Sequence, residues 1–102
     1  MDSQARFEER LAALRDAFVG GLPARLDGLR AALAAGDRVA VQVEAHRLAG
    51  TGVSYGLPEL SEWGRAVERL CKAAAPVAEL ARALDELALL VTSLCPPRSA
   101  MG

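Results

Sequence analysis

Apolar residues in the first third of the chain recur at spacings of three and four, and this period restricts the fold more than any other feature. The series is Phe7, Leu11, Leu14, Phe18, Leu22, Leu26, Leu29 and Leu33. Such spacing places side chains on one face of an α-helix, whereas a half-buried strand alternates every second residue. No run in the chain keeps a period of two for long. The fold class is therefore predicted to be all-α.

Glycine and proline residues divide the chain into five expected helices. Gly20-Gly21-Leu22-Pro23 interrupts the first stripe, because proline lacks a backbone donor and restricts the residue before it. Gly36 and Asp37 suit the C′ and N-cap positions of consecutive helices. Gly56-Leu57-Pro58 repeats this stop and start, and Pro76 ends the next helix. The expected helices span residues 3–19, 22–35, 38–55, 58–75 and 77–94.

The short turns between these helices favour antiparallel neighbours. We therefore expect an antiparallel up-down four-helix bundle with an additional N-terminal helix. A length of 102 residues suits one domain with its own core and is too short for two. We assign residues 1–102 to this single domain, with the bundle core at about residues 20–95 and a tail at residues 96–102.

Composition and charge exclude several classes of partner. The net charge of -1 offers no electrostatic attraction to nucleic acid or to an anionic membrane. No apolar run approaches the roughly 20 residues of a membrane span, and the N-terminus lacks the apolar core of a signal peptide, so a cytoplasmic location is expected. Cys71 and Cys95 are too few and too far apart for a metal site or a disulfide framework and are expected to be free thiols.

His46, the single histidine, is expected on the outward side of the third helix. At 100° per residue the buried stripe of that helix lies along a common line, about 140° from His46. The members of this stripe are Val41, Ala45, Leu48, Gly52 and Tyr55. The neighbours of His46 on the outward side are small or apolar, as on a docking surface. They are Val39, Gln42, Val43, Gly50 and Val53.

Several roles for this histidine can be compared. Metal binding is poorly supported, because no second histidine exists and no carboxylate lies one turn away on the same face. The sequence has no nucleophile-elbow motif that would suggest a hydrolase. An exposed imidazole with no bulky neighbours can itself serve as a nucleophile. An ordinary polar surface residue is the alternative.

The residues around His46 carry a resemblance to a known family. His46-Arg47-Leu48-Ala49-Gly50 is followed by Gly56 and by Leu57-Pro58-Glu59-Leu60, which opens a new helix. This arrangement resembles the signature of histidine-containing phosphotransfer (HPt) domains, His-x-Leu-Lys-Gly, five residues, Gly, and a helix ending in Leu-Glu. Val67-Glu68 stands where that last pair is expected. The similarity extends upstream to Phe18 and so covers most of the chain.

The resemblance implies a function, partners and site residues. His46 would accept a phosphoryl group through Nε2 from a receiver-domain aspartate or a histidine kinase, and pass it to a receiver domain of a response regulator. Glu68 matches the family position that hydrogen-bonds Nδ1, and helical phase also places it at an edge facing a neighbouring helix. An ordinary solvated charge is equally compatible with Glu68.

The same reading implies a relay substrate rather than an enzyme. The chain has no nucleotide-binding motif, and no cofactor of its own is expected, since the receiver domain would supply Mg²⁺. Val39, Gln42, Val43, Gly50 and Val53 would form the surface on which partners dock. The protein is expected to be a monomer.

One position departs from the family pattern. Ala49 stands where the family usually has a lysine, so a cation that could help to hold the phosphate is absent there. Arg65 is the candidate for this role, because in an antiparallel pair of helices it lies toward the level of Ala49 and Gly50. An exposed arginine that only solubilises the helix is the alternative.

Two other functions remain open at this point. The first is an HPt-like binding module that docks on a kinase or receiver without transferring phosphate, which the loss of the lysine at position 49 would favour. The second is a structural bundle that self-associates through the His46 face.

Overall fold

The computed structural model describes residues 2–95, and within this range the protein is all-α, as predicted, and contains no strand. The helices are α1 (Asp2–Gly20), α2 (Leu22–Ala34), α3 (Arg38–Ser54), α4 (Pro58–Lys72) and α5 (Val77–Leu94). The tail predicted at residues 96–102 lies outside the described residues.

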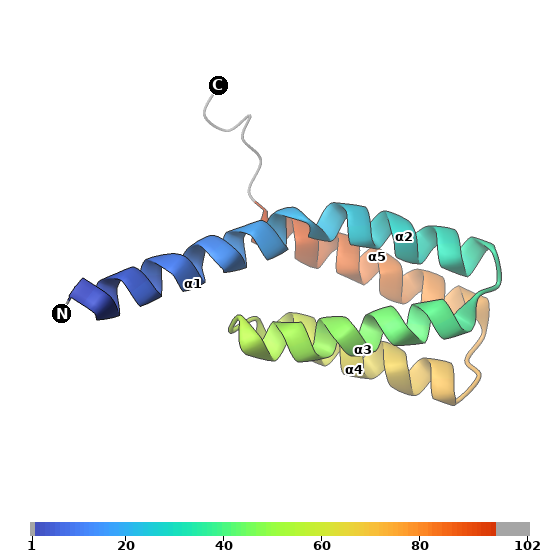
Figure 1. Ribbon diagram of the computed structural model, residues 1–102. Coiled ribbons are helices and arrows are strands. Elements are labelled where there is room, and N and C mark those ends of the chain that lie inside the picture. Colours follow the sequence, from blue (N-terminus) through green and yellow to red (C-terminus); the bar gives the residue numbers. More distant parts are fainter. Residues whose placement is uncertain (1, 96–102) are drawn as a thin grey trace, which may run out of the picture.

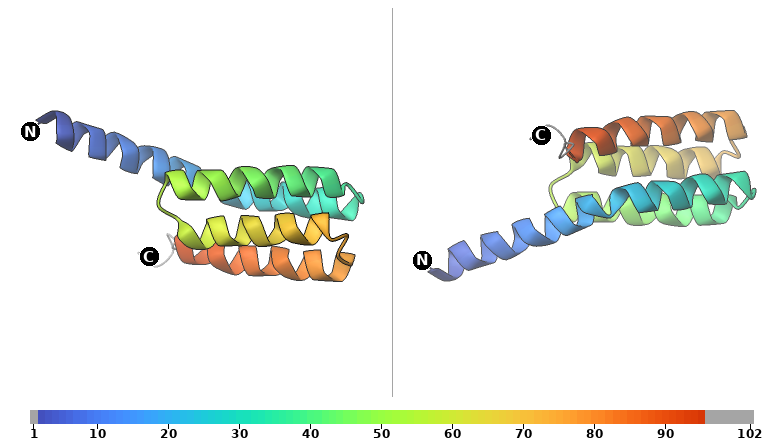
Figure 2. Two further views of the ribbon diagram at one scale, coloured as in Figure 1. Left: turned by 90° about the horizontal axis from the view of Figure 1, so that it is seen from below. Right: turned by 90° about the horizontal axis from the view of Figure 1, so that it is seen from above.

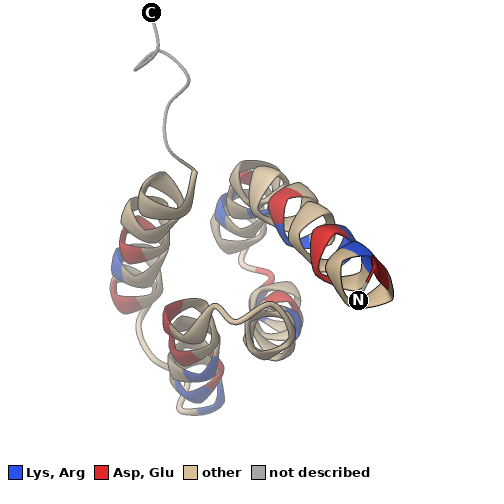
Figure 3. Ribbon diagram, turned by 90° about the vertical axis from the view of Figure 1, so that its left-hand side faces the viewer, with Lys and Arg blue, Asp and Glu red and all other residues tan. Residues whose placement is uncertain are grey.

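Helices α2 to α5 form an antiparallel bundle in which each helix packs on two others (Figure 1). α3 contacts α2 and α4, and α5 contacts α4 and α2, so the four helices close around a common core. Two further views show α3 and α4 lying side by side along their whole length (Figure 2). An end-on view shows α2–α5 around one axis, with α1 to one side (Figure 3). The fully buried large side chains are Leu22, Leu29, Val41, Leu48, Leu60, Val67, Leu80, Leu84 and Leu87.

Helix α1 extends beyond one end of the bundle and buries none of its residues (Figure 1). Only Gly21 separates it from α2, and Pro23 lies in the first turn of α2, as predicted. Phe7, Leu11 and Leu14 are exposed. The regular spacing of these residues correctly indicates an amphipathic helix, but spacing shows which face is apolar and not whether another element covers it. The joint itself is ordered by Phe18, whose ring stacks on Tyr55 with centroids 5.3 Å apart.

The turns on either side of α3 have the local structure that their residues predict. The Asp37 carboxylate accepts a hydrogen bond from the Ala40 amide at 3.0 Å and so caps the start of α3. Gly36 and Gly56 have φ values of 75° and 67°, a left-handed conformation that a residue without Cβ adopts at little cost. These turns set the antiparallel order of α2, α3 and α4.

Helix α4 ends at Lys72, three residues before the predicted end at residue 75. Ala75 precedes Pro76, and a residue in that place is disfavoured in helical conformation. The chain therefore leaves the helix through Ala74, which takes a φ of 54°, while the Ala75 amide donates to the Leu70 carbonyl at 2.9 Å. This is the hydrogen bond of a Schellman C-cap, formed here without a glycine.

The buried face of α4 differs in part from the stripe that helical spacing predicts, which is Leu57, Leu60, Gly64, Val67, Cys71 and Ala74. Ala74 is exposed, whereas Ser61 and Trp63, which lie outside that stripe, are buried. The Trp63 indole Nε1 donates to the Ala83 carbonyl of α5 at 2.8 Å. This hydrogen bond satisfies a polar group that would otherwise be costly to bury, and it joins α4 to α5.

Candidate functional site

His46 lies near the middle of α3 with its side chain 75% exposed, as predicted. The helix is anchored on its opposite side by Val41, Ala45 and Leu48, which are buried in the bundle core. Because that face is fixed by packing, the imidazole is held on the outer surface of a regular helix.

Glu68 of α4 contacts the ring directly. Its Oε2 lies 3.1 Å from His46 Nδ1, and its side chain is only 18% exposed. An ionised carboxylate only accepts hydrogen bonds, so this contact assigns the proton of a neutral imidazole to Nδ1. Nε2 then carries a lone pair. The geometry leaves the ring able to react through Nε2.

The helices α3 and α4 approach very closely beside this pair. A Cβ built on Gly64 would lie 2.5 Å from the Ala45 carbonyl oxygen and 2.9 Å from the Ala49 Cβ. One turn away, a Cβ on Gly52 would lie 2.5 Å from Ser61 Oγ, and this hydroxyl donates to the Ala49 carbonyl at 2.7 Å. The glycines thus allow near backbone contact, which brings Glu68 within reach of His46.

Helical spacing predicts only part of this close packing. The predicted buried stripes include Gly52 of α3 and Gly64 of α4, but they omit Ala49, which is buried in the structure. The available signal was the pair of small residues Ala45 and Ala49, four apart on α3, opposite Gly64. Small residues at such spacing allow two helix backbones to come together.

A shallow hollow of about 220 Å³ surrounds the imidazole. Its lining residues are His46, Ala49, Gly50, Val53, Arg65 and Glu68. The structure therefore brings together His46, Glu68 and Arg65, the three side chains that the sequence selected. Gly50 has no atom near its Cβ position, so the hollow is open beside the ring.

Three of the cationic side chains on α3 and α4 differ in their partners. Lys72 Nζ lies 3.8 Å from the same Glu68 Oε2 that contacts His46. Arg47 lies 3.9 Å from Glu44 and points away from the ring, as its helical phase predicts. Arg65 makes no ion pair with any side chain in the part of the chain that the structure describes.

The predicted docking residues lie around His46 on one side of α3. Val39, Val43, Val53 and Gly50 are exposed, and Gln42 is half-buried. Their role as a docking surface stays a prediction.

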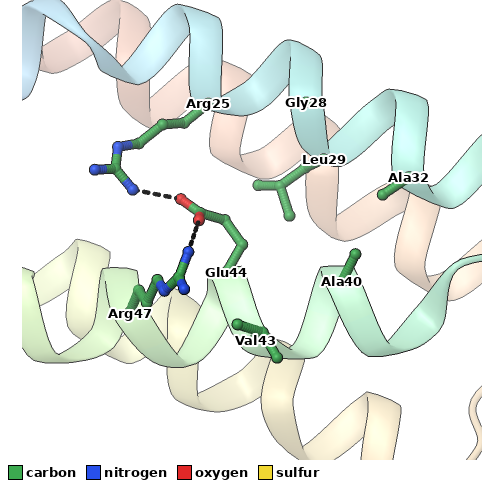
Figure 4. A pocket seen from close by; sticks show the side chains of 8 residues that line it. All are labelled: Arg25, Gly28, Leu29, Ala32, Ala40, Val43, Glu44 and Arg47. Carbon is green, nitrogen blue, oxygen red and sulfur yellow. Dashed lines mark hydrogen bonds and ion pairs between the residues drawn. The ribbon is translucent and has the colours of Figure 1, made fainter.

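A second hollow, of about 320 Å³, lies between α2 and α3 and shares Val43 with these docking residues (Figure 4). Glu44 points across it toward Arg25 of α2, with Oε2 2.7 Å from Arg25 Nη1, while Arg47 approaches the other carboxylate oxygen. Leu29 and Val43 lie beyond this charged group (Figure 4). The apolar surface near His46 thus continues into a groove with charged groups at one end.

Cys71 lies one turn after Glu68 and is half-buried. Burial raises the pKa of its thiol, the nearby Arg38 guanidinium opposes this effect, and the Glu68 carboxylate adds to it. The raised pKa keeps the group protonated at neutral pH, so it is a poor nucleophile and a poor metal ligand.

The described residues give no sign of a metal centre or a membrane segment. Among residues 2–95, no group of three or more His, Cys, Asp and Glu side chains is placed to hold a metal ion. Over the same range, no helix has both the length and the hydrophobicity that a membrane crossing requires.

Comparison with known proteins agrees with this geometry. The family model described as Hpt domain matches residues 13–95, which include the four helices of the bundle and every residue of the hollow. No curated protein and no solved structure matches the chain significantly.

Proposed function

Because this chain belongs to the Hpt domain family, whose members act as phosphotransfer modules in two-component signalling, we propose that it relays a phosphoryl group through His46. The donor is a receiver-domain aspartyl phosphate or a histidine kinase, and the acceptor is the receiver domain of a response regulator. The observation that carries this proposal is the contact between Nδ1 of the exposed His46 and Glu68.

The proposed reaction needs few residues of this chain. The lone pair of Nε2 attacks phosphorus, an Nε2–P bond forms, and the P–O bond to the donor aspartate breaks as the carboxylate leaves. The ring becomes an imidazolium whose Nδ1–H still donates to Glu68, and this carboxylate stabilises the positive charge. The reverse sequence delivers the phosphoryl group to an acceptor aspartate.

The partner supplies what this surface lacks. Phosphoryl transfer depends on positioning and on stabilisation of charge, and a receiver domain contributes Mg²⁺ and acidic ligands for it. The chain itself is proposed to need no cofactor and to have no nucleotide-binding or hydrolytic site.

Partner docking is assigned to the side of α3 that carries His46. The exposed residues Val39, Val43 and Val53 present an apolar surface around the imidazole, and such a surface favours contact with a protein partner. The groove between α2 and α3 extends this surface through Val43.

Incubation with a phosphorylated receiver domain tests the proposal. The protein should acquire phosphate that is labile in acid and stable in base, as a phosphoramidate bond is, and the His46→Gln variant should acquire none. Label that persists in His46→Gln would refute a relay through this residue.

A second candidate is an HPt-like adaptor that binds a kinase or receiver without accepting phosphate. The identity of residue 49 favours it, because a buried alanine stands three residues after His46 where the family usually has a lysine. In this case His46→Ala would bind the receiver domain as tightly as the wild-type protein, and no phosphate would move in either.

A further inference from the structure

We propose that Arg65 binds the phosphoryl group on His46, and that α4 supplies this cation because the close packing of Ala49 against Gly64 favours a small residue on α3. The inference rests on the proposed function of His46. It adds a residue that touches the transferred group, whereas Glu68 contacts the ring at Nδ1, orients it and stabilises its positive charge.

A phosphoryl group on Nε2 needs a compensating charge. It brings close to two negative charges at neutral pH, comparable to a phosphorylated side chain. The Glu68 carboxylate, 3.1 Å from the other ring nitrogen, is a negative charge already in place, and it repels the incoming group. A cation on the open side of the ring offsets this repulsion and stabilises the charge on phosphorus.

Arg65 is in place to do this. It is exposed and lines the hollow of about 220 Å³ that also contains His46 and Glu68. Residue 65 lies one turn before Glu68 on α4, so the two side chains border the hollow from adjacent turns of one helix. Since no side chain among residues 2–95 forms an ion pair with it, the guanidinium is free to turn toward a ligand. Its planar group can donate two parallel hydrogen bonds to phosphoryl oxygens.

The neighbouring cations are less suited to this task. Lys72 lies against Glu68, on the Nδ1 side of the ring. Arg47 lies against Glu44 and lines the separate groove between α2 and α3. Arg69 is not among the residues that line the hollow around His46.

The packing of Ala49 explains why the cation comes from α4. Ala49 is 7% exposed, and its Cβ occupies the space that the missing Cβ of Gly64 leaves. A lysine at position 49 would start from this contact, and its first carbons would crowd Gly64 before the chain reached the hollow, which disfavours a long side chain there. We therefore connect the arginine at position 65 with the small residues at positions 49 and 64. The small residues bring the helices together, and the arginine supplies the charge that a small residue at position 49 cannot.

Phosphorylation by phosphoramidate tests this role without any protein partner. Nε2 attacks phosphorus, the Nε2–P bond forms, and the P–N bond of phosphoramidate breaks with release of ammonia. Arg65→Ala should slow the phosphorylation of His46 by about tenfold, in line with the loss of a charge-assisted hydrogen bond, and Arg65→Lys should restore part of the rate. Arg69→Ala removes the same charge one turn further along α4 and is the matched control.

The outcomes separate this inference from the proposed function. Slow phosphorylation of Arg65→Ala, with a normal rate for Arg69→Ala and unchanged thermal unfolding for both, supports the role of Arg65. Equal rates for the wild-type protein and Arg65→Ala overturn that role and leave His46 as the acceptor. Failure of the wild-type protein to take up phosphate at His46 from both phosphoramidate and a phosphorylated receiver overturns the inference and the proposed function together.

Discussion

Gly64 of α4 faces Ala49 of α3 so closely that a Cβ on the glycine would lie 2.9 Å from the Ala49 Cβ. The contact lies directly beside the His46–Glu68 pair and sets the distance between the two helices that carry it.

Gly64→Ala should destabilise the protein strongly. The added methyl group meets the Ala45 carbonyl oxygen and the backbone of Ala49, which cannot move aside as a flexible side chain could. Overpacking of this kind costs about 1–3 kcal/mol and sometimes more. Urea denaturation followed by circular dichroism measures the loss.

Gly28→Ala is the matched control for this prediction. Gly28 is also helical, but no atom lies within 4 Å of its Cβ position. Alanine there should stabilise the protein by about 0.5–1 kcal/mol, because it reduces the conformational entropy of the unfolded chain. Equal effects of the two substitutions would contradict the close contact between α3 and α4.

Glu68→Gln should slow the phosphorylation of His46 by phosphoramidate. The amide oxygen can still accept the Nδ1 proton, but it lacks the charge that stabilises an imidazolium. The difference between a charged and a neutral hydrogen bond is about 1 kcal/mol, or roughly fivefold in rate. Glu62→Gln, an exposed change on the same helix, should leave the rate unchanged. If both variants react equally fast, the Glu68 carboxylate has no part in the reaction.

Removal of residues 1–16 should leave the stability of the bundle nearly unchanged. α1 buries none of its residues, and Phe18, which stacks on Tyr55, is retained in this variant. We expect the free energy of unfolding to change by less than about 1 kcal/mol, as for other changes at exposed positions. A large fall in the midpoint of thermal unfolding would show that α1 supports the bundle.

The stability should depend on pH through Cys71. Because its pKa is raised in the folded protein, the folded state holds the thiol proton more tightly than the unfolded state does. At neutral pH the thiol is protonated in both states, so it makes the stability no more dependent on pH. As pH rises above 9.0, the ordinary pKa of the thiol, the free energy of unfolding falls.

Cys71→Ala isolates this contribution from other groups that titrate in the same range. The wild-type protein should lose more stability than this variant between pH 7 and pH 10. A constant difference between the two proteins at both pH values would contradict the prediction.

Much of the fold could be predicted because its boundaries depend on local chemistry. Gly36, Asp37 and Gly56 each suit one backbone conformation or one capping bond, and the ends of α3 lie within one residue of the prediction. The end of α4 was harder, because alanine at position 74 gives no sign that it will adopt a left-handed conformation. The sequence shows that Pro76 cannot continue the helix. It does not show how many residues before Pro76 are already non-helical.

The sequence was sufficient to predict which residues form the site, but not how closely the two helices that carry them pack. Helical phase placed His46 outward and Glu68 at a helix edge, and the family resemblance paired them. The interhelical distance could not be obtained in this way, because it depends on which small residues of α3 meet Gly64 of α4. Phase likewise could not show that α1 lies outside the bundle, since an apolar face looks the same in the sequence whether or not it is covered.

The exposure of His46 has a consequence for timing. Among residues 2–95 no segment covers the imidazole, which is 75% exposed. A phosphoryl group there would be accessible to water whenever no partner is docked, since no segment among residues 2–95 has to open to release it. The fraction of phosphoryl groups that reaches an acceptor would then depend on the rate of hydrolysis relative to the rate of encounter with a partner. A higher concentration of partner would therefore raise the yield of transfer.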